Sequence, residues 1–440
     1  MNDNLKMKKF YNTGLSKNPD FIKRQLLYLQ YLIKGYESEI YQALKTDLCK
    51  SKSEAYLTEL GMVYQELKYH LDHPLSNKRV KTPLSLQFGK SEVVREAYGH
   101  VLIIVPFNYP IQLGLIPLIS AIACGNVVSL LLSDKLSATH HFYQKLFSHF
   151  SSSYLNYLGQ DHRLIEKVKY DFIFFTGSKE VGRIIAKKAI EDDSEYCLEL
   201  GGKSPCLVSE HSNLKLAAKK IVWGKLINAG QTCVAVDYVL VDKKISKEFI
   251  KLVQNERKKQ KLSISNPDYP ALVNQRALDR IQSLLKDQEF SETKTLNLKM
   301  DLAIVVNPSL DSDLMKEEIF GPILPIIEYN SLNEALDYIK ENDKPLAAYI
   351  FSNNSFEIDT FKEKISAGSI AVNDCVIQLA NPNLPFGGVN SSGRGKYHHQ
   401  YSSELFSHPK AVYTSYNPID LPLRYQPFSN VKDWLIKQLL

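Results

Sequence analysis

The chain has 440 residues, of which 44% are hydrophobic and 23% charged, a composition typical of a soluble globular protein with two or three domains. This composition excludes a wholly disordered chain, a collagen-like repeat and a disulfide-stabilised mini-protein. The net charge of +6 is spread along the chain without a block of like charges, so it does not indicate nucleic acid binding.

The N-terminal region is predicted to be helical from residue 18 to residue 80. Asn18-Pro19 fits a helix start, because asparagine can cap the first turn and proline is accommodated within it. An apolar stripe follows, which comprises Leu26, Leu27, Leu29, Leu32 and Ile33. Residues 85–99 alternate enough between polar and apolar side chains to predict a hairpin.

Residues 101–132 contain no charged side chain, and the run is long enough for a membrane-spanning helix. However, Pro106, Pro110 and Pro117 would interrupt such a helix. The segment is therefore interpreted as a buried strand over 101–105, a proline-bounded turn, a buried helix over about 111–123 and a second strand over 127–132. Two apolar strands that flank an apolar helix are typical of a parallel sheet covered on both faces.

Strands and helices continue to alternate along the rest of the chain. Strands are predicted at 172–175, 196–200, 237–241, 302–306, 324–327 and 347–351. Helices are predicted directly after residue 178, at about 214–227 and at 332–340. This alternation predicts an α/β protein with doubly wound sheets.

The six cysteines form no Cys-x-x-Cys pair, and no histidines stand near them at metal-ligand spacing, so no metal site is predicted. The first residues lack the apolar segment of a secretory signal. Free thiols in a cytoplasmic protein are therefore expected. A cysteine that carries function here would act through its reactivity.

Four motifs contain groups that could carry chemistry. Residues 176–182 join a strand to a helix, and the free N–H groups of a helix start can bind phosphate. Glu199 ends a strand before two glycines, where a buried carboxylate would have a raised pKa suited to a base. Cys233 lies in a glycine-containing loop and is a candidate nucleophile. The fourth motif, residues 317–322, brings two acids to an aromatic side chain and a Gly-Pro turn. Taken singly, these motifs are equally well explained as a turn, a surface acid, a buried thiol and a loop.

Taken together and in this order, the motifs resemble the aldehyde dehydrogenase superfamily over residues from about 20 to about 410. The resemblance is carried by Pro106-Phe107-Asn108-Tyr109-Pro110, Phe175-Thr176-Gly177-Ser178, Leu198-Glu199-Leu200-Gly201-Gly202-Lys203-Ser204-Pro205, Gly230-Gln231-Thr232-Cys233, Glu318-Ile319-Phe320-Gly321-Pro322 and Leu384-Pro385-Phe386-Gly387-Gly388-Val389. Trp223-Gly224-Lys225, Asp237-Tyr238 and Tyr397-His398 are similar to the class 3 branch, which contains the fatty and aromatic aldehyde dehydrogenases.

The resemblance implies an aldehyde dehydrogenase-like fold, with two doubly wound Rossmann-type domains and a small β oligomerisation arm. It implies a dinucleotide-binding domain over residues 1–84 and 100–200 and a catalytic domain over 201–388. The arm is expected over 85–99 and 389–420, and residues 421–440 are expected to hold a C-terminal amphipathic helix.

The resemblance also implies oxidation of an aldehyde to the carboxylic acid with NAD or NADP as the cofactor. Cys233 matches the nucleophile that forms a thiohemiacetal and then a thioester. Asn108 matches the amide that donates to the oxyanion, and Glu199 matches the base that activates the hydrolytic water. The residues that match the cofactor site are Gly177, Ser178, Val181 and Gly182 at the phosphates, Glu318 at the nicotinamide ribose and Phe320 at the nicotinamide.

Leu131 departs from the family pattern, because relatives commonly have a lysine there that holds the adenosine ribose or the extra phosphate of NADP. Losing a charged hydrogen bond costs roughly 1.5–3 kcal/mol. Weakened dinucleotide binding is therefore expected, and Leu131→Lys is expected to tighten it. One alternative is a pseudoenzyme that binds aldehydes or partners, against which the retained Cys233, Glu199 and Asn108 argue. Another is a reductase of acyl-CoA or acyl-protein thioesters, which needs no water-activating base, so Glu199 counts against it.

The expected substrate is a small-molecule aldehyde, with a medium- or long-chain aliphatic or an aromatic group. Residues 431–440 are predicted to form a short amphipathic helix, which cannot span a bilayer. It could pack on its own domain, or it could serve as a lid or a peripheral membrane contact for apolar aldehydes. No nucleic acid partner and no transmembrane segment are expected, and the resemblance implies a homodimer.

Overall fold

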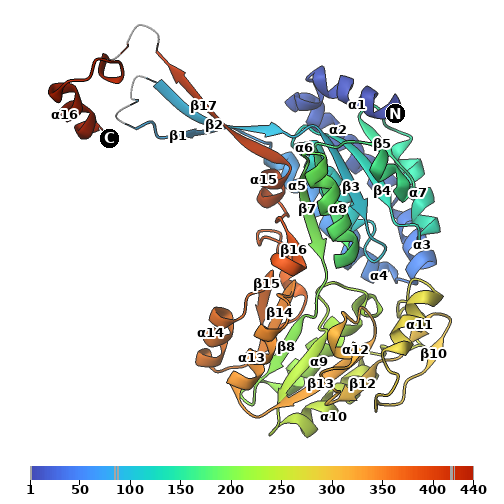
Figure 1. The fold of residues 1–440 in the computed structure, drawn as a ribbon. Helices are drawn as coiled ribbons and strands as arrows, with labels where there is room; N and C mark the ends of the chain where they lie inside the picture. The colour runs from blue at the N-terminus through green and yellow to red at the C-terminus, as the bar shows by residue number, and fades with distance from the viewer. Residues whose placement is uncertain (1, 84–85, 87–88, 417–419, 421, 440) are drawn as a thin grey trace.

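The computed structural model describes residues 2–83, 86, 89–416, 420 and 422–439 of the chain. Within these residues, two six-stranded sheets lie one above the other, and a long three-stranded arm projects to one side (Figure 1). Helices pack on both sheets, so the predicted α/β class is confirmed. No helix in the described part of the chain is long and apolar enough to cross a membrane.

The first sheet has the strand order β16-β7-β6-β3-β4-β5 and is parallel except for β16. Its strands are β3 (His100–Val105), β4 (Val127–Leu132), β5 (Leu155–Tyr157), β6 (Phe172–Gly177), β7 (Glu195–Leu200) and β16 (Gly393–Arg394). Its helices are α1 (Asn2–Asn12), α2 (Pro19–Gly35), α3 (Glu37–Leu48), α4 (Lys52–Ala55), α5 (Gly61–Asp72), α6 (Gln112–Ala123), α7 (Ser137–Phe147) and α8 (Lys179–Glu191). Every residue of β3, β4 and α6 is buried, which explains the uncharged run without a membrane.

The second sheet is parallel throughout, with the order β12-β13-β9-β8-β14-β15. Its strands are β8 (Pro205–Val208), β9 (Tyr238–Asp242), β12 (Ala303–Val306), β13 (Ile323–Tyr329), β14 (Ala347–Phe351) and β15 (Ser369–Val372). The helices that follow these strands are α9 (Leu214–Leu226), α10 (Ser246–Lys259), α11 (Gln275–Ser283), α12 (Asp313–Lys316), α13 (Leu332–Glu341) and α14 (Ser355–Lys364). A small ribbon of β10 (Thr295–Leu296) and β11 (Lys299–Met300) lies beside them.

The arm consists of β1 (Lys78–Val80), β2 (Gly89–Ala97) and β17 (Ser407–Ser415), with β2 in the centre. Residues 85, 87 and 88 of the predicted hairpin lie outside the described residues. The described residues of 85–99 contain no hairpin, because residues 89–97 form the single strand β2, which pairs antiparallel with β1 and with β17. The alternation was correct for a strand, but both partners lie outside the predicted segment, one just before it and one in the C-terminal region. After β17, α16 (Asn430–Leu439) lies at the far end of the arm with no buried residue (Figure 1). The short α15 (Gln400–Leu405) leads into β17.

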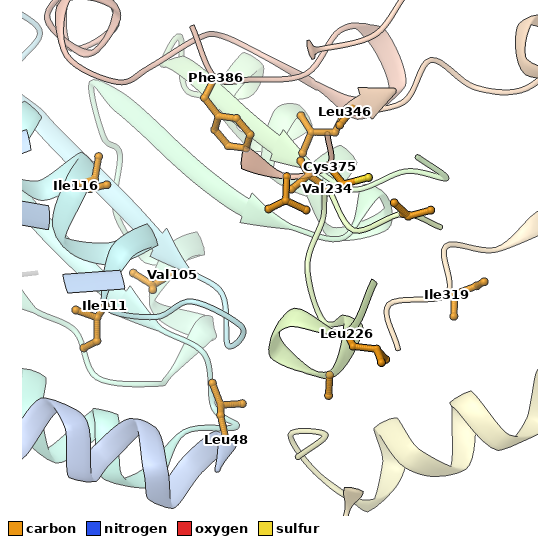
Figure 2. Packing of buried hydrophobic residues seen from close by; sticks show 14 of the residues in the cluster. Leu48, Val105, Ile111, Ile116, Leu226, Val234, Ile319, Leu346, Cys375 and Phe386 are labelled. Carbon is orange, nitrogen blue, oxygen red and sulfur yellow. The ribbon is translucent and has the colours of Figure 1, made fainter. Parts of the chain in front are cut away.

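The two sheets share a continuous apolar core. Figure 2 shows part of it, with Val105, Ile111 and Ile116 contributed by the first sheet and its helix. Leu226, Val234 and Phe386 come from the second part of the chain and belong to the same cluster of buried residues. Because this packing joins the two halves, the loops at the carboxyl ends of β3, β6 and β7 face loops of the second sheet at a fixed separation.

Candidate active site

A cavity of about 430 Å³ lies where the carboxyl ends of the first sheet meet loops of the second. Parallel sheets commonly bind ligands at this edge. Eight of the nine predicted site residues line the cavity: Asn108, Gly177, Ser178, Val181, Glu199, Cys233, Glu318 and Phe320. They come from parts of the chain more than 200 residues apart, so the fold brings the separate motifs together at one place.

Cys233 lies in the loop between the 3-10 turn Ile227–Gly230 and β9. Asn228 and Ala229 in this turn have φ values of 52° and 54°, in the left-handed region that side chains other than glycine rarely adopt. Residue Cys233 is partly exposed, whereas Cys124, Cys197, Cys206 and Cys375 are buried. Burial and the nearby charges of Glu318 and Glu199 raise the pKa of the Cys233 thiol, and the backbone N–H groups of Cys233 and Val234 oppose this rise.

Asn108 is buried in the turn between β3 and α6, directly behind the Cys233 loop. Its Nδ2 donates to the backbone oxygen of Gln231 over 3.0 Å. A carboxamide nitrogen carries two hydrogens, so one N–H remains for another acceptor. The next residue, Tyr109, makes a hydrogen bond of 2.5 Å with the hydroxyl of Thr232. The turn that carries the amide is therefore bonded to the loop that carries the thiol.

Glu199 is the penultimate residue of β7, where the strand delivers its side chain into the cavity. The carboxyl group is buried, and burial raises its pKa well above the usual range, while the charge on Lys396 opposes the rise. Its Oε1 lies 3.9 Å from the sulfur of Cys197, and its Oε2 has no hydrogen-bond partner among the described residues. A buried carboxyl with a free oxygen is suited to take a proton from water.

The strand–helix junction at 176–182 forms the other end of the cavity. Ser178 caps α8, and its hydroxyl accepts the N–H of Val181 at 3.4 Å. The remaining free N–H groups of the first turn suit a phosphate. Gly182 does not line the cavity. It lies where α8 packs closely against β7, because a Cβ at this position would lie 2.6 Å from Cδ2 of Leu200.

Glu318 reaches the cavity from the segment before β13. A Cβ at Gly201 would overlap its carboxylate, so the glycine makes room for the acid. Burial and the charge of Asp237 raise the pKa of Glu318 to about 8, and the N–H of Gly202 opposes this. Phe320 follows with φ of 53°, and its ring meets Phe107 edge-on at 5.8 Å. A helix start, a carboxylate and apolar rings along one cavity fit the phosphates, ribose and bases of a dinucleotide.

Leu131 does not line the cavity. It is fully buried in an apolar cluster with Leu102, Ile104 and Phe175. Three basic side chains that sequence reasoning did not single out line the cavity, namely Lys135, His162 and Arg280. Lys135 lies in the loop after β4, with Nζ 4.5 Å from the centre of the Phe107 ring. Its position just beyond a strand end was a usable signal, whereas nothing in the sequence pointed to His162.

Arg280 in α11 donates to the backbone oxygen of Glu318 over 3.3 Å and to that of Ile319. It therefore holds the segment that carries Glu318 and Phe320 in place. Among the described residues, no three or more His, Cys, Asp or Glu side chains are grouped so that they could hold a metal ion.

Comparison with known proteins identifies the family of this chain. A model of the aldehyde dehydrogenase family matches residues 18–412. The chain is 39% identical to a 4,4'-diaponeurosporen-aldehyde dehydrogenase of Staphylococcus aureus, over 92% of this chain and 91% of the relative. It is 35% identical to aldehyde dehydrogenase family 3 member H1 of Arabidopsis thaliana, over 99% and 93%. The solved structure of a substrate-bound S. aureus AldH, 37% identical, matches with a TM-score of 0.96 over 99% of this chain and 98% of the other. This chain belongs to the aldehyde dehydrogenase family and is similar to members of its class 3 branch.

Proposed function

We propose that this protein oxidises an aldehyde to the carboxylic acid through an acyl intermediate on Cys233, with NAD or NADP as the cofactor. One observation carries the proposal: a single cavity is lined by Cys233, by the buried Asn108 and by the buried Glu199, and it continues to the start of α8 and to Glu318. Acyl transfer needs a nucleophile, an oxyanion donor and a base, and these three groups supply them.

In the proposed reaction, the Cys233 thiolate forms a bond to the aldehyde carbon. The carbonyl π electrons move to oxygen, and the resulting thiohemiacetal anion accepts hydrogen bonds from the free N–H of Asn108 and the backbone N–H of Cys233. Loss of hydride from that carbon leaves a thioester on Cys233. A bound nicotinamide dinucleotide supplies the hydride acceptor. Glu199 then takes a proton from water, the resulting hydroxide attacks the thioester carbon, and the C–S bond breaks to release the acid and the thiolate.

The residues proposed to hold the dinucleotide are Gly177, Ser178 and Val181 at the phosphates and Glu318 at the nicotinamide ribose. The free amides at the start of α8 and the room that Gly201 leaves for the Glu318 carboxylate support this assignment. Phe320 is proposed to support the nicotinamide ring. Lys135 supplies a cation at the same cavity, which offsets the missing cation at Leu131.

The proposed substrate is an aldehyde with a medium- or long-chain aliphatic or an aromatic group. Similarity to class 3 relatives supports it, as does the 39% identical relative that is named for 4,4'-diaponeurosporen-aldehyde. The test is to incubate the purified protein with NAD or NADP and a medium-chain aldehyde, in parallel with Cys233→Ser. Steady formation of reduced cofactor by the native protein alone supports the proposal, and no formation with either cofactor contradicts it.

The pseudoenzyme alternative gains no support, because the nucleophile, amide and base meet at one cavity and the matched relatives are named as dehydrogenases. The same assay distinguishes the proposed aldehyde oxidation from the alternative reaction, reduction of an acyl thioester. A requirement for coenzyme A, or reduction of an acyl thioester without acid release, would favour that reaction over the one proposed.

The arm is proposed to pair with that of a second copy, which makes the protein a homodimer. Supporting this, β17 is an edge strand along its nine pairs with β2, and a three-stranded sheet that projects from the body has little core of its own. The exposed Val431 and Trp434 of α16 suit a contact with that copy or with a membrane surface. A cytoplasmic location is proposed because all six cysteines are unpaired.

A further inference from the structure

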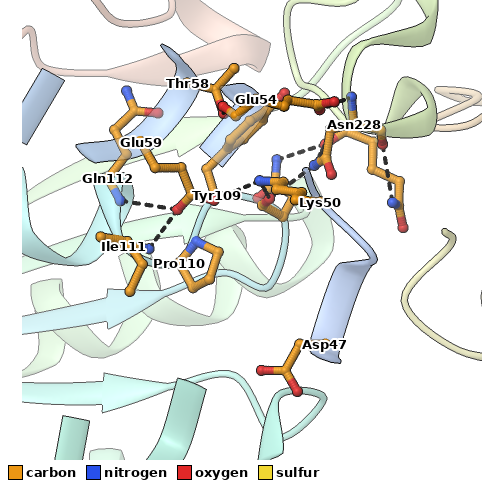
Figure 3. Close-up of polar contacts among 12 residues, drawn as sticks. Asp47, Lys50, Glu54, Thr58, Glu59, Tyr109, Pro110, Ile111, Gln112 and Asn228 are labelled. Atoms are coloured by element: carbon orange, nitrogen blue, oxygen red, sulfur yellow. Dashed lines mark hydrogen bonds and ion pairs between the residues drawn. The ribbon is translucent and has the colours of Figure 1, made fainter. Parts of the chain in front are cut away.

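A fully buried ion pair lies behind the proposed oxyanion donor. Nζ of Lys50 lies 2.6 Å from Oε1 of Glu59, and both side chains have 0% exposure. The same Nζ donates to the backbone oxygen of Asn108 over 2.8 Å and sits 4.0 Å from the centre of the Tyr109 ring (Figure 3). The ammonium therefore has three partners, two of which belong to the turn that carries the amide.

The ion pair is not explained by stability alone. Removing two charges from water is unfavourable, and well-packed apolar side chains can often replace a buried pair without loss of stability. Glu59 also lies in a π-helical turn, Tyr56–Leu60, a conformation that is rare and frequent at functional sites. Its second oxygen, Oε2, accepts the N–H groups of Ile111 and Gln112 at 2.8 and 3.3 Å, where α6 begins.

The contacts on Asn108 clamp its backbone as well as its side chain. Its oxygen accepts from Lys50 and, over 2.9 Å, from Nδ2 of Asn228. That nitrogen also lies 3.2 Å from the oxygen of Gln231, to which the Asn108 side chain donates. Glu54 accepts the backbone N–H of Asn228 at 2.8 Å (Figure 3). The first helices thus hold the amide and the strained turn before Cys233 in one network.

We propose that Lys50 and Glu59 are positioning residues, which fix the Asn108 turn so that its free N–H points to the place where the oxyanion develops. This inference rests on the proposed function, because it assumes that Asn108 donates to an oxyanion on a Cys233 adduct. Loss of the pair would move the turn, and a displacement of about 1 Å at a reacting centre can lower a rate about 100-fold.

The test distinguishes an effect on oxyanion stabilisation by Asn108 from an effect on the reactivity of the Cys233 thiol. Acylation of Cys233 by p-nitrophenyl acetate without dinucleotide develops an oxyanion, whereas alkylation by iodoacetamide does not. Lys50→Met could leave Glu59 unpaired and unfold the protein, so the double variant Lys50→Met/Glu59→Leu and the isosteric Glu59→Gln are measured as well. Lys52→Met removes an exposed ammonium two residues away and is the matched control.

The expected result is acylation about 100-fold slower in the double variant and about tenfold slower in Glu59→Gln, with alkylation within about twofold of the native rate. In an Asn108→Ala background the double variant should cause little further loss, because the pair acts through that residue. A folded double variant that acylates at the native rate, or in which alkylation falls equally, overturns the inference. If the native protein itself is not acylated, the result contradicts the proposed function of Cys233 rather than the role of the ion pair.

Discussion

The side chain of Asn108 donates to the backbone oxygen of Gln231 over 3.0 Å, across 123 positions of sequence. Gln231 stands two residues before Cys233, so this hydrogen bond joins the amide to the backbone of the loop that carries the thiol. An oxyanion donor contributes to catalysis only when it is fixed before the charge develops, and this bond fixes it.

Asn108→Ala is therefore expected to lower kcat/KM for aldehyde oxidation by about 10²–10³-fold, the usual effect of removing one oxyanion donor. Most of the loss should appear in kcat, because the donor acts in the transition state more than on the bound aldehyde. Steady-state kinetics measure this, with dinucleotide affinity as the control for an intact site. A loss below about threefold would exclude Asn108 as the donor.

Lys135→Met is expected to weaken dinucleotide binding by about tenfold, because it removes an exposed cation from the cavity. Titration calorimetry with NAD and with NADP measures the effect, and a larger loss for NADP would place Lys135 at the extra phosphate. Lys187→Met on the outer side of α8 is the control, since Lys187 does not line the cavity. Equal affinities for the native protein and Lys135→Met would remove Lys135 from the site.

The structure also changes the expectation for Leu131→Lys. Leu131 is surrounded by aliphatic and aromatic side chains, and an ammonium placed there without a partner would be costly. This substitution is now expected to lower the melting temperature without tightening dinucleotide binding. Calorimetry that shows a clear gain in affinity, with the melting temperature unchanged, would instead mean that a lysine from this position reaches the cavity.

Glu318 should make stability depend on pH. Its pKa of about 8 in the folded protein, against an ordinary value of 4.5, means that the folded state holds a proton that the unfolded state releases. The free energy of unfolding should therefore fall as pH rises from about 4.5 to about 8, by about 2 to 4 kcal/mol after allowance for solvent screening.

Glutamine does not titrate, so Glu318→Gln lacks this loss of stability with rising pH. The melting temperature of Glu318→Gln should therefore rise relative to that of the native protein between pH 5 and pH 8. Thermal unfolding across this pH range measures the difference. Glu317→Gln, which changes the exposed neighbouring carboxyl, should follow the native curve. A constant difference between Glu318→Gln and the native protein would show that the pKa of Glu318 is not raised.

Much of the fold could be predicted because buried strands and helices are encoded by long apolar runs in the sequence. The strands at 127–132 and 347–351 were predicted to the residue, since both are buried, uncharged and mostly apolar segments with a parallel strand on each side. The short β8 and β15 were missed, because a segment of only four residues carries little periodicity. Periodicity alone did not identify the pairing of β2 with β17, about 300 residues away, whereas the family resemblance assigned both segments to one arm.

The residues of the candidate site likewise include some that the sequence identified and others that it did not. Cys233, Glu199 and Asn108 were identified from ordered motifs, and the sequence placed each at a loop or a strand end. Lys50 and Glu59 were not identified, although they touch Asn108 and α6, because they lie on segments that read only as helical. A buried ion pair is a property of the tertiary structure, and no local pattern records it.

The acyl intermediate on Cys233 is tested most directly in Glu199→Gln, where the base is removed and the nucleophile and amide remain. Mixed with a medium-chain aldehyde and NAD, this variant should release a burst of about one equivalent of NADH per site and then stall, because the thioester cannot be hydrolysed. Mass spectrometry should find the acyl group on the peptide that contains Cys233, and the same mixture with Cys233→Ser should give neither burst nor adduct. Full steady turnover by Glu199→Gln, or a burst without an acyl group on Cys233, would contradict the account.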